Sequence, residues 1–125
     1  GHLIGSELLG RVGMRLNQLA RETDMCFRYG GDEFVVMLPE TSAEDALLAA
    51  MRLHQELINT RFRMSNGLKL TASASVGLYT IAGEGHEWPG GPKLSATLTK
   101  ELGPQTTAIN ANNVMWAFFQ AHALP

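Results

Sequence analysis

The sequence is poor in cysteine, in charge of one sign and in long apolar runs. Its one cysteine among 125 residues, Cys26, excludes a disulfide framework and a cysteine-based zinc cluster. Ten basic against twelve acidic residues give a net charge of −2, so no basic surplus predicts binding to a nucleic acid polymer. No apolar run approaches the roughly 20 residues of a membrane span, and no signal peptide is visible. We therefore expect a cytoplasmic globular protein with no membrane partner.

The first part of the chain is poor in proline, and the last part is poor in charged residues. Residues 1–80 contain 17 of the 22 charged residues and one of the five prolines, whereas residues 81–125 contain the remainder. Residues 81–105 show no sustained period, and Gly90-Gly91-Pro92 is a strong breaker of regular structure. We expect two regions, 1–80 and a Gly/Pro-rich loop with a C-terminal helix over 81–125, that fold as one unit.

Apolar residues recur at helical spacing in three segments. The stripes are Leu8, Val12, Leu16 and Leu19; Ala46, Ala50, Leu53 and Leu57; and Val114, Ala117, Phe118 and Ala121. Thr41-Ser42 ahead of Glu44-Asp45 forms a capping-box pattern for the second helix, and Asn110 is placed to cap the third. The same pattern leaves His54 among exposed helix residues, where we expect it to be solvated.

Strand patterns lie between these helices. Met25–Tyr29 and Glu33–Leu38 flank Gly30-Gly31, which predicts a β-hairpin because two glycines can adopt positive φ. The Asn66-Gly67 turn precedes Leu68–Val76, where apolar and polar residues alternate as in a strand. Helix, hairpin, helix and strand in this order predict an α+β fold.

The hairpin tip carries the strongest chemical pattern. Gly30-Gly31 allows a bulky anionic ligand to approach the backbone closely. Asp32 and Glu33 follow directly, and paired carboxylates suit Mg²⁺, which takes one or two of them together with substrate phosphates. The residues alone leave the alternative of an ordinary polar turn.

The stretch Arg28–Phe34 is identical to the signature of the GGDEF family, the diguanylate cyclases. Other segments also resemble that family: Gly1–Gly5, Arg21–Asp24, Leu38–Thr41 and Ala74–Gly77. The resemblance covers about residues 1–80 and implies a ferredoxin-like palm, an antiparallel sheet with helices. The family's first strand, which is central in the sheet, does not occur in this sequence, so we expect the palm to be incomplete.

The resemblance implies that two GTP molecules are condensed into cyclic di-GMP by a dimer, with Mg²⁺. It implies that Gly30 and Gly31 border the phosphates, that Asp32 binds the metal, and that Glu33 assists the metal or activates the 3′-hydroxyl. It also implies an inhibitory product site at Arg21 and Asp24. The alternative for that pair is a surface ion pair of little energetic value.

Three departures from the family bear on activity. Ser6 stands where the family usually has an aspartate for the guanine edge, and a hydroxyl cannot accept two hydrogen bonds as a carboxylate does. The family's first-strand aspartate and its C-terminal lysine and Gly-Arg-Asn ending are not found here. We therefore expect a catalytically impaired domain that binds GTP or cyclic di-GMP weakly, with a non-catalytic chimera as the alternative.

The loss of a central strand has a structural consequence. Glu33–Leu38 and Leu68–Val76 then pair directly, or another segment or a second chain fills the gap between them. Unpaired strand edges favour association, so we expect a homo-oligomer.

The tail has a resemblance of its own. Gly83–Gly91 contains Gly-x-Gly-His-x-Trp-Pro-Gly, which is similar to the C-terminal part of polyhydroxybutyrate-depolymerase and feruloyl-esterase-like α/β-hydrolases. The resemblance covers residues 83–125 and implies that His86 is a triad base and that the chain is a chimera with residual hydrolase activity. No Gly-x-Ser-x-Gly elbow occurs in the chain, so an inert loop histidine is the alternative.

Overall fold

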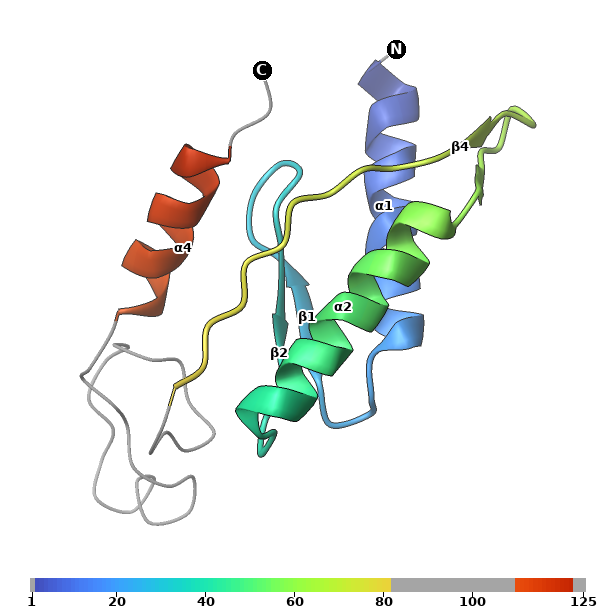
Figure 1. The fold of residues 1–125 in the computed structure, drawn as a ribbon. Helices are drawn as coiled ribbons and strands as arrows, with labels where there is room; N and C mark the ends of the chain where they lie inside the picture. Colours follow the sequence, from blue (N-terminus) through green and yellow to red (C-terminus); the bar gives the residue numbers. More distant parts are fainter. Residues whose placement is uncertain (1, 82–109, 123–125) are drawn as a thin grey trace, which may run out of the picture. The chain divides into compact units, whose positions relative to one another are not determined.

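The computed structural model describes residues 2–81 and 110–122, and the chain divides into two compact units, residues 1–78 and residues 79–125. The first unit contains two helices and two strand pairs, and the second contains one described helix (Figure 1). The elements are α1 His2–Leu19, β1 Met25–Arg28, β2 Phe34–Met37, α2 Ala43–Asn59, β3 Phe62–Arg63, β4 Lys69–Leu70 and α4 Ala111–Ala121. The predicted α+β class is confirmed.

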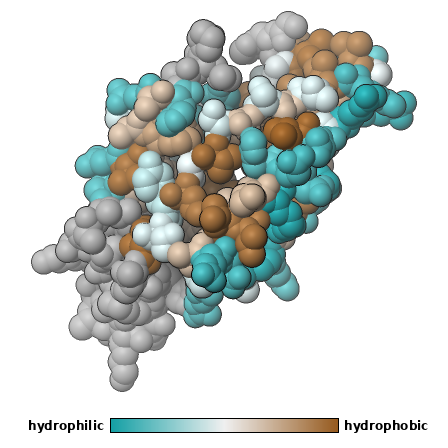
Figure 2. All heavy atoms as spheres, viewed as in Figure 1, coloured by the Kyte–Doolittle hydropathy of each residue, from teal (hydrophilic) through white to brown (hydrophobic). Residues whose placement is uncertain are grey.

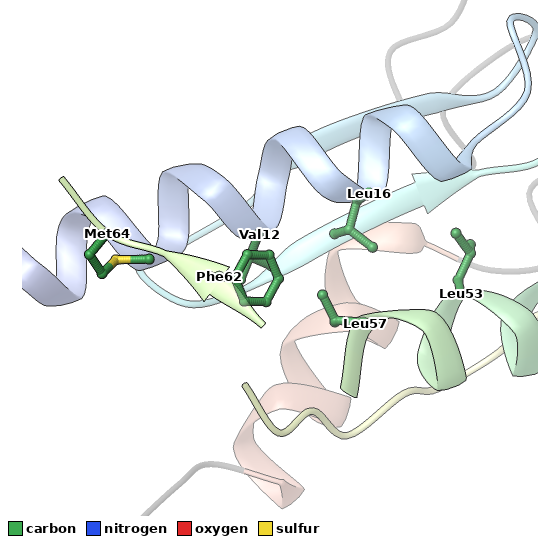
Figure 3. Packing of buried hydrophobic residues seen from close by; sticks show 6 residues of the cluster. All are labelled: Val12, Leu16, Leu53, Leu57, Phe62 and Met64. Atoms are coloured by element: carbon green, nitrogen blue, oxygen red, sulfur yellow. The ribbon is translucent and has the colours of Figure 1, made fainter. Parts of the chain in front are cut away.

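The core of the first unit lies between α1, α2 and the β3 strand. Its buried side chains face one another in Figure 3. They are Val12 and Leu16 from α1, Leu53 and Leu57 from α2, and Phe62 and Met64 from β3 and the residues after it. Full burial of one such side chain contributes about 1.5–3 kcal/mol, so these contacts hold the two helices together. The predicted stripes of both helices are thus the faces that pack.

The β1–β2 hairpin packs against α1 through one face. Its strands are antiparallel, with the pairs Met25 and Met37, Cys26 and Val36, Phe27 and Val35, and Arg28 and Phe34. Phe34 and Val36 contact the core, whereas Met25 on the opposite face is exposed. Gly13 of α1 makes this approach possible, because a Cβ there would lie 3.2 Å from Cε1 of Phe34.

The start of α2 follows the predicted capping pattern. The Ser42 hydroxyl accepts a hydrogen bond from the Asp45 backbone N–H at 3.1 Å, which satisfies one of the free donors at the helix N-terminus. The outer face of α2 is less polar than expected, since Leu47, Leu48 and Met51 are 51%, 65% and 61% exposed. Figure 2 shows apolar patches on this face of the molecule, interrupted by polar side chains.

The predicted strand over Leu68–Val76 is shorter than expected. Only Lys69–Leu70 forms a ladder, with the short β3 strand that the sequence did not predict. Residues 71–78 stay extended without a described strand partner, and they do not pair with β2 (Figure 1). The alternation nevertheless persists, because Ala72 and Ala74 pack against the core. A strand is defined by a hydrogen-bonded ladder to a neighbouring strand, and residues 71–78 form no such ladder in the described chain.

His54 of α2 holds this extended segment from the side. Its Nε2 lies 3.0 Å from the carbonyl oxygen of Ala74, so Nε2 must carry the proton and donate. The expectation that His54 is simply solvated is therefore wrong. Its hydrogen bond partly replaces the missing ladder, because an extended backbone without a paired strand leaves its carbonyls without partners.

A second link that the sequence did not reveal joins α1 to the turn before β4. The carboxylate of Glu7 accepts hydrogen bonds from the backbone N–H and the hydroxyl of Ser65, at 2.5 and 2.9 Å. Arg11, one turn further along α1, pairs with the same carboxylate at 3.1 Å. Gly67 closes this turn with φ of 87°, a left-handed conformation that glycine adopts without strain.

The described helix of the second unit is α4. Asn110 caps it as predicted, with its side-chain oxygen accepting from the Asn113 backbone N–H at 3.1 Å. At its end, the ring of His122 stacks on Phe118 with the ring centres 4.3 Å apart. Neither α4 nor any helix of the first unit, within the residues described, is long and apolar enough to cross a membrane.

Candidate functional site

The tip of the β1–β2 hairpin is a tight turn over residues 29–33. The backbone N–H groups of Tyr29 and Gly30 both donate to the carbonyl oxygen of Glu33, at 2.8 and 3.3 Å. The last strand pair, Arg28 with Phe34, lies directly below this turn. The hairpin thus presents its two glycines and two acidic residues together at one exposed end, as the sequence predicted.

The two glycines differ from each other, and neither has the backbone conformation expected of it. Neither adopts positive φ; among the described glycines, only Gly67 does. A Cβ on Gly30 would lie 2.1 Å from Oε2 of Glu33, whereas a Cβ on Gly31 would meet nothing within 4 Å. The carboxylate of Glu33 therefore folds over Gly30, and the missing side chain is what makes room for it. Gly31 leaves open space beside the backbone.

Arg28 folds back over the turn from the end of β1. Its Nε donates to the carbonyl oxygens of Gly30 and Gly31 at 3.2 and 2.8 Å, and its Nη2 donates to Gly31 as well. Sequence reasoning placed Arg28 in the signature but assigned it no role. An arginine two residues before a Gly-Gly turn was the available signal, because its long side chain can reach the turn's carbonyls.

Within residues 2–81 and 110–122, the two carboxylates of the tip lack the hydrogen bonds and ion pairs that hold a structural carboxylate in place. Asp32 is exposed and Glu33 is half-buried, and the described chain offers no hydrogen bond or ion pair to either side chain. No group of three or more acidic, histidine or cysteine side chains gathers there or elsewhere in the described residues. A cation held by Asp32 and Glu33 therefore needs further oxygens from a ligand, which is how Mg²⁺ binds with phosphates. The residues fit that ion.

Arg21 and Asp24 meet at the opposite end of the hairpin, as predicted. The guanidinium of Arg21 donates to both carboxylate oxygens of Asp24, with Nη2–Oδ1 at 2.7 Å and Nε–Oδ2 at 3.2 Å. The backbone N–H of Arg21 adds a third bond at 2.7 Å, and the side chain of Asp24 is only 3% exposed. The Thr41 hydroxyl accepts from Arg21 Nη2 at 2.7 Å and fixes the outer edge of the guanidinium. This pair is better built than a loose surface ion pair.

The electrostatics of this corner favour the charged form of Asp24. Burial alone would raise the pKa of its carboxyl group. The hydrogen bonds from Arg21 and the charges of Arg21 and Arg52 outweigh that effect, so the pKa lies below its usual value. Arg52 belongs to α2, and its Nη2 donates to the carbonyl oxygen of Leu19 at 3.0 Å. Sequence reasoning missed Arg52, because only folding brings α2 to this corner.

Ser6 does not join either group of residues. It is exposed on the first half of α1, and no hydrogen bond of its side chain occurs within the described chain. Figure 1 shows this half of α1 and the hairpin tip pointing toward the same end of the first unit, with the Arg21–Asp24 corner at the other. His86 and the rest of Gly83–Gly91 lie outside the described residues.

Comparison with known proteins gives the family directly. The family described as "Diguanylate cyclase, GGDEF domain" matches residues 1–90. The chain is 40% identical over 86 residues to "Response regulator PleD" of Caulobacter vibrioides, which is 68% of this chain and 19% of that protein. It is 36% identical over 77 residues to "Diguanylate cyclase DosC" of Escherichia coli K12, which is 62% of this chain and 17% of that protein.

A third relative concerns the tail. "Probable diguanylate cyclase DgcC" of Escherichia coli K12 is 32% identical over 114 residues, which is 89% of this chain and 30% of that protein. The family match continues to residue 90 and that alignment covers 89% of the chain, so both extend past residue 80 into the segment on which the hydrolase resemblance rested. The hydrolase origin of residues 83–125 therefore finds no support. The chain spans less than a third of the length of these three relatives, and it belongs to the GGDEF family of diguanylate cyclase domains.

Proposed function

We propose that this chain provides the hairpin of a diguanylate cyclase domain with impaired catalysis, which binds GTP with Mg²⁺ and joins two GTP molecules into cyclic di-GMP only slowly. The observation that carries the proposal is the hairpin tip. There the carboxylates of Asp32 and Glu33, which have no hydrogen bond or ion pair within the described chain, lie next to the glycine backbone. Membership of the GGDEF family supports the same assignment. The names of two relatives, DosC and DgcC, state that activity for those proteins.

In this proposal, Asp32 and Glu33 hold the metal ion together with the phosphates of the nucleotide. The ion supplies positive charge that offsets the negative charge of the transferring phosphate. Gly31 leaves open space in which the phosphates come close to the backbone, and Gly30 borders them beside the carboxylate of Glu33. Glu33, whose carboxylate lies over Gly30, is also assigned the acceptance of a proton from an attacking hydroxyl. Ser6 offers one hydroxyl to the base, which predicts weak binding of guanine and slow turnover.

The Arg21–Asp24 corner is proposed as a second anion site, for the product cyclic di-GMP. The side chain of Arg21 is about half exposed, whereas that of Asp24 is almost fully covered. The guanidinium of Arg21 can therefore donate hydrogen bonds to a phosphate or a guanine edge that approaches from solvent. Arg52 adds a second positive charge to the same corner, as its effect on Asp24 shows. Thr41 keeps the Arg21 guanidinium in one orientation.

Two further expectations belong to this proposal. Condensing two nucleotides requires two tips that face each other, so we propose that the domain works as a homo-oligomer. GTP is an intracellular nucleotide, which supports a cytoplasmic site of action. Light scattering over a range of concentrations, with and without GTP and Mg²⁺, tests the first of these. A mass that stays monomeric under all conditions contradicts it.

The decisive experiment separates binding from turnover. Calorimetric titration of GTP with Mg²⁺ should show binding that is lost in Asp32→Asn, whereas Glu33→Gln should lower product formation more than binding. Glu44→Gln, an exposed acidic residue in the first turn of α2, is the matched control and should bind GTP as the parent does. Absence of GTP binding by the folded parent contradicts the proposal. Binding without cyclic di-GMP in the product analysis reduces the function to nucleotide binding.

A further inference from the structure

We propose that Arg28 is a positioning residue, which turns the backbone N–H groups of Gly31 and Asp32 toward the phosphates by holding the carbonyl groups on their other side. The inference rests on the proposed function, because it assigns those amides to the nucleotide. It begins from the hydrogen bonds of Arg28 to the carbonyl oxygens of Gly30 and Gly31.

The geometry of the peptide bond fixes the direction of the neighbouring N–H groups. In a planar trans peptide the C=O of one residue and the N–H of the next point in opposite directions. The peptides of this turn are trans, since no cis bond occurs in the described chain. The carbonyls of Gly30 and Gly31 both point at the guanidinium of Arg28. The N–H groups of Gly31 and Asp32 therefore point to the side away from it.

These two N–H groups are available to a ligand. The turn is closed by the amides of Tyr29 and Gly30, and nothing among the described residues accepts a hydrogen bond from the amide of Gly31 or Asp32. The position of a Gly31 Cβ is empty to a distance of 4 Å. Two neighbouring donors on an open side suit a phosphate oxygen, because hydrogen bonds to an anion are about twice as strong as neutral ones.

The same contacts commit two of the three guanidinium nitrogens of Arg28 to the turn. Nε and Nη2 both donate to its carbonyl oxygens, so through these atoms the side chain acts on the backbone. A planar guanidinium can hold two neighbouring carbonyls at once, whereas a lysine ammonium is a single point charge. Substitution of Arg28 by lysine, which keeps the charge but not the planar shape, therefore separates the effects of the two. The competing explanation is that Arg28 leaves the turn and contacts the phosphate itself.

The first readout needs no nucleotide. In ¹⁵N NMR spectra of the full chain, Arg28→Gln should shift the amide signals of Gly31 and Asp32 and speed their hydrogen exchange. Arg63→Gln removes the same charge from an exposed arginine of β3 and should leave those signals unchanged. Unchanged Gly31 and Asp32 signals in Arg28→Gln overturn the inference, whether or not the parent binds GTP.

The second readout is binding of GTP with Mg²⁺ by calorimetry. Loss of the two oriented donors should weaken binding about tenfold in Arg28→Gln, with no change in Arg63→Gln. Arg28→Lys should recover less than half of the lost binding free energy, because the charge returns without the fork. Full recovery in Arg28→Lys shows a direct contact of charge with phosphate and overturns the positioning role. A parent that does not bind GTP contradicts the proposed function. The amide signals of Gly31 and Asp32 then test the positioning role of Arg28 on their own.

Discussion

The two ends of the hairpin carry similar residues in opposite situations. At the end opposite to the tip, the carboxylate of Asp24 accepts hydrogen bonds from three N–H groups of Arg21, and its side chain is almost completely covered. At the tip, Asp32 and Glu33 have no such partner in the described chain, and the neighbouring arginine is bound to carbonyls instead. A carboxylate that is saturated by donors stabilises the fold, whereas one that is left open can bind a cation. The comparison therefore assigns a stabilising role to Asp24 and a cation-binding role to Asp32 and Glu33.

The largest expected effect is on stability, and it distinguishes the two ends. Asp24→Ala removes the acceptor of the Arg21 guanidinium and backbone N–H, and should lower the free energy of unfolding by about 1–3 kcal/mol. Asp32→Ala removes the same charge from the exposed tip and should change it by less than about 0.5 kcal/mol. Urea unfolding followed by circular dichroism measures both. Equal effects would show that the two ends do not differ.

The second prediction compares the two glycines of the tip. Gly30→Ala places a methyl group where Oε2 of Glu33 lies, so the carboxylate must move and GTP·Mg²⁺ binding should weaken about tenfold. The fold should survive, because the displaced group is the end of a flexible side chain. Gly31→Ala meets open space and is the control, with an effect below about threefold. A larger loss in Gly31→Ala than in Gly30→Ala contradicts the placement of Glu33.

The third prediction concerns acid. The pKa of Asp24 is lower in the folded chain than its ordinary value, so the unfolded chain binds this proton first as the pH falls. The stabilisation is complete above the ordinary aspartate pKa, about 3.9, and is lost as the pH falls through the lower folded value. Asp24→Asn should therefore lose less stability than the parent below about pH 5. Parallel pH profiles of the two proteins would remove Asp24 as the cause.

The smallest predicted effect is that of Thr41→Val. The substitution keeps the shape of the side chain but removes the acceptor for Arg21 Nη2, which should cost about 0.5–1.5 kcal/mol of stability. The proposed cyclic di-GMP site should weaken by a few-fold, because the Arg21 guanidinium loses its fixed orientation, while GTP binding at the tip stays constant. Titrations with the two nucleotides provide the measurement. A parallel loss of both would show that the two ends are not independent.

Much of the first unit was predictable because its signals are local. The stripes of α1 and α2 give their buried faces, Ser42 gives the start of α2, and Gly30-Gly31 between two apolar runs gives the hairpin. The grouping of Gly30, Gly31, Asp32 and Glu33 follows from adjacency in the chain. Their chemistry is therefore readable without the fold.

Three failures of prediction share one cause, which is distance along the chain. Leu68–Val76 has the alternation of a strand, but whether it pairs depends on a backbone that its own residues do not specify. His54 contacts a carbonyl twenty residues away, and Arg52 a carbonyl 33 residues away. The positive φ expected of Gly30 is a separate, local failure: the residue does not adopt it, and the carboxylate of Glu33 lies in the space that its missing side chain leaves.

The sequence by itself determined the α+β class, the hairpin, its acidic tip and the pairing of Arg21 with Asp24. These depend on periodicity, turn residues and neighbours within a few positions, which act before the chain is compact. The tertiary structure alone decided which carboxylate is saturated and which is open, where the Arg28 guanidinium rests, and that α2 brings Arg52 to the Asp24 corner. Burial and hydrogen-bond partners are properties of the packed chain, so they appear only when distant segments meet.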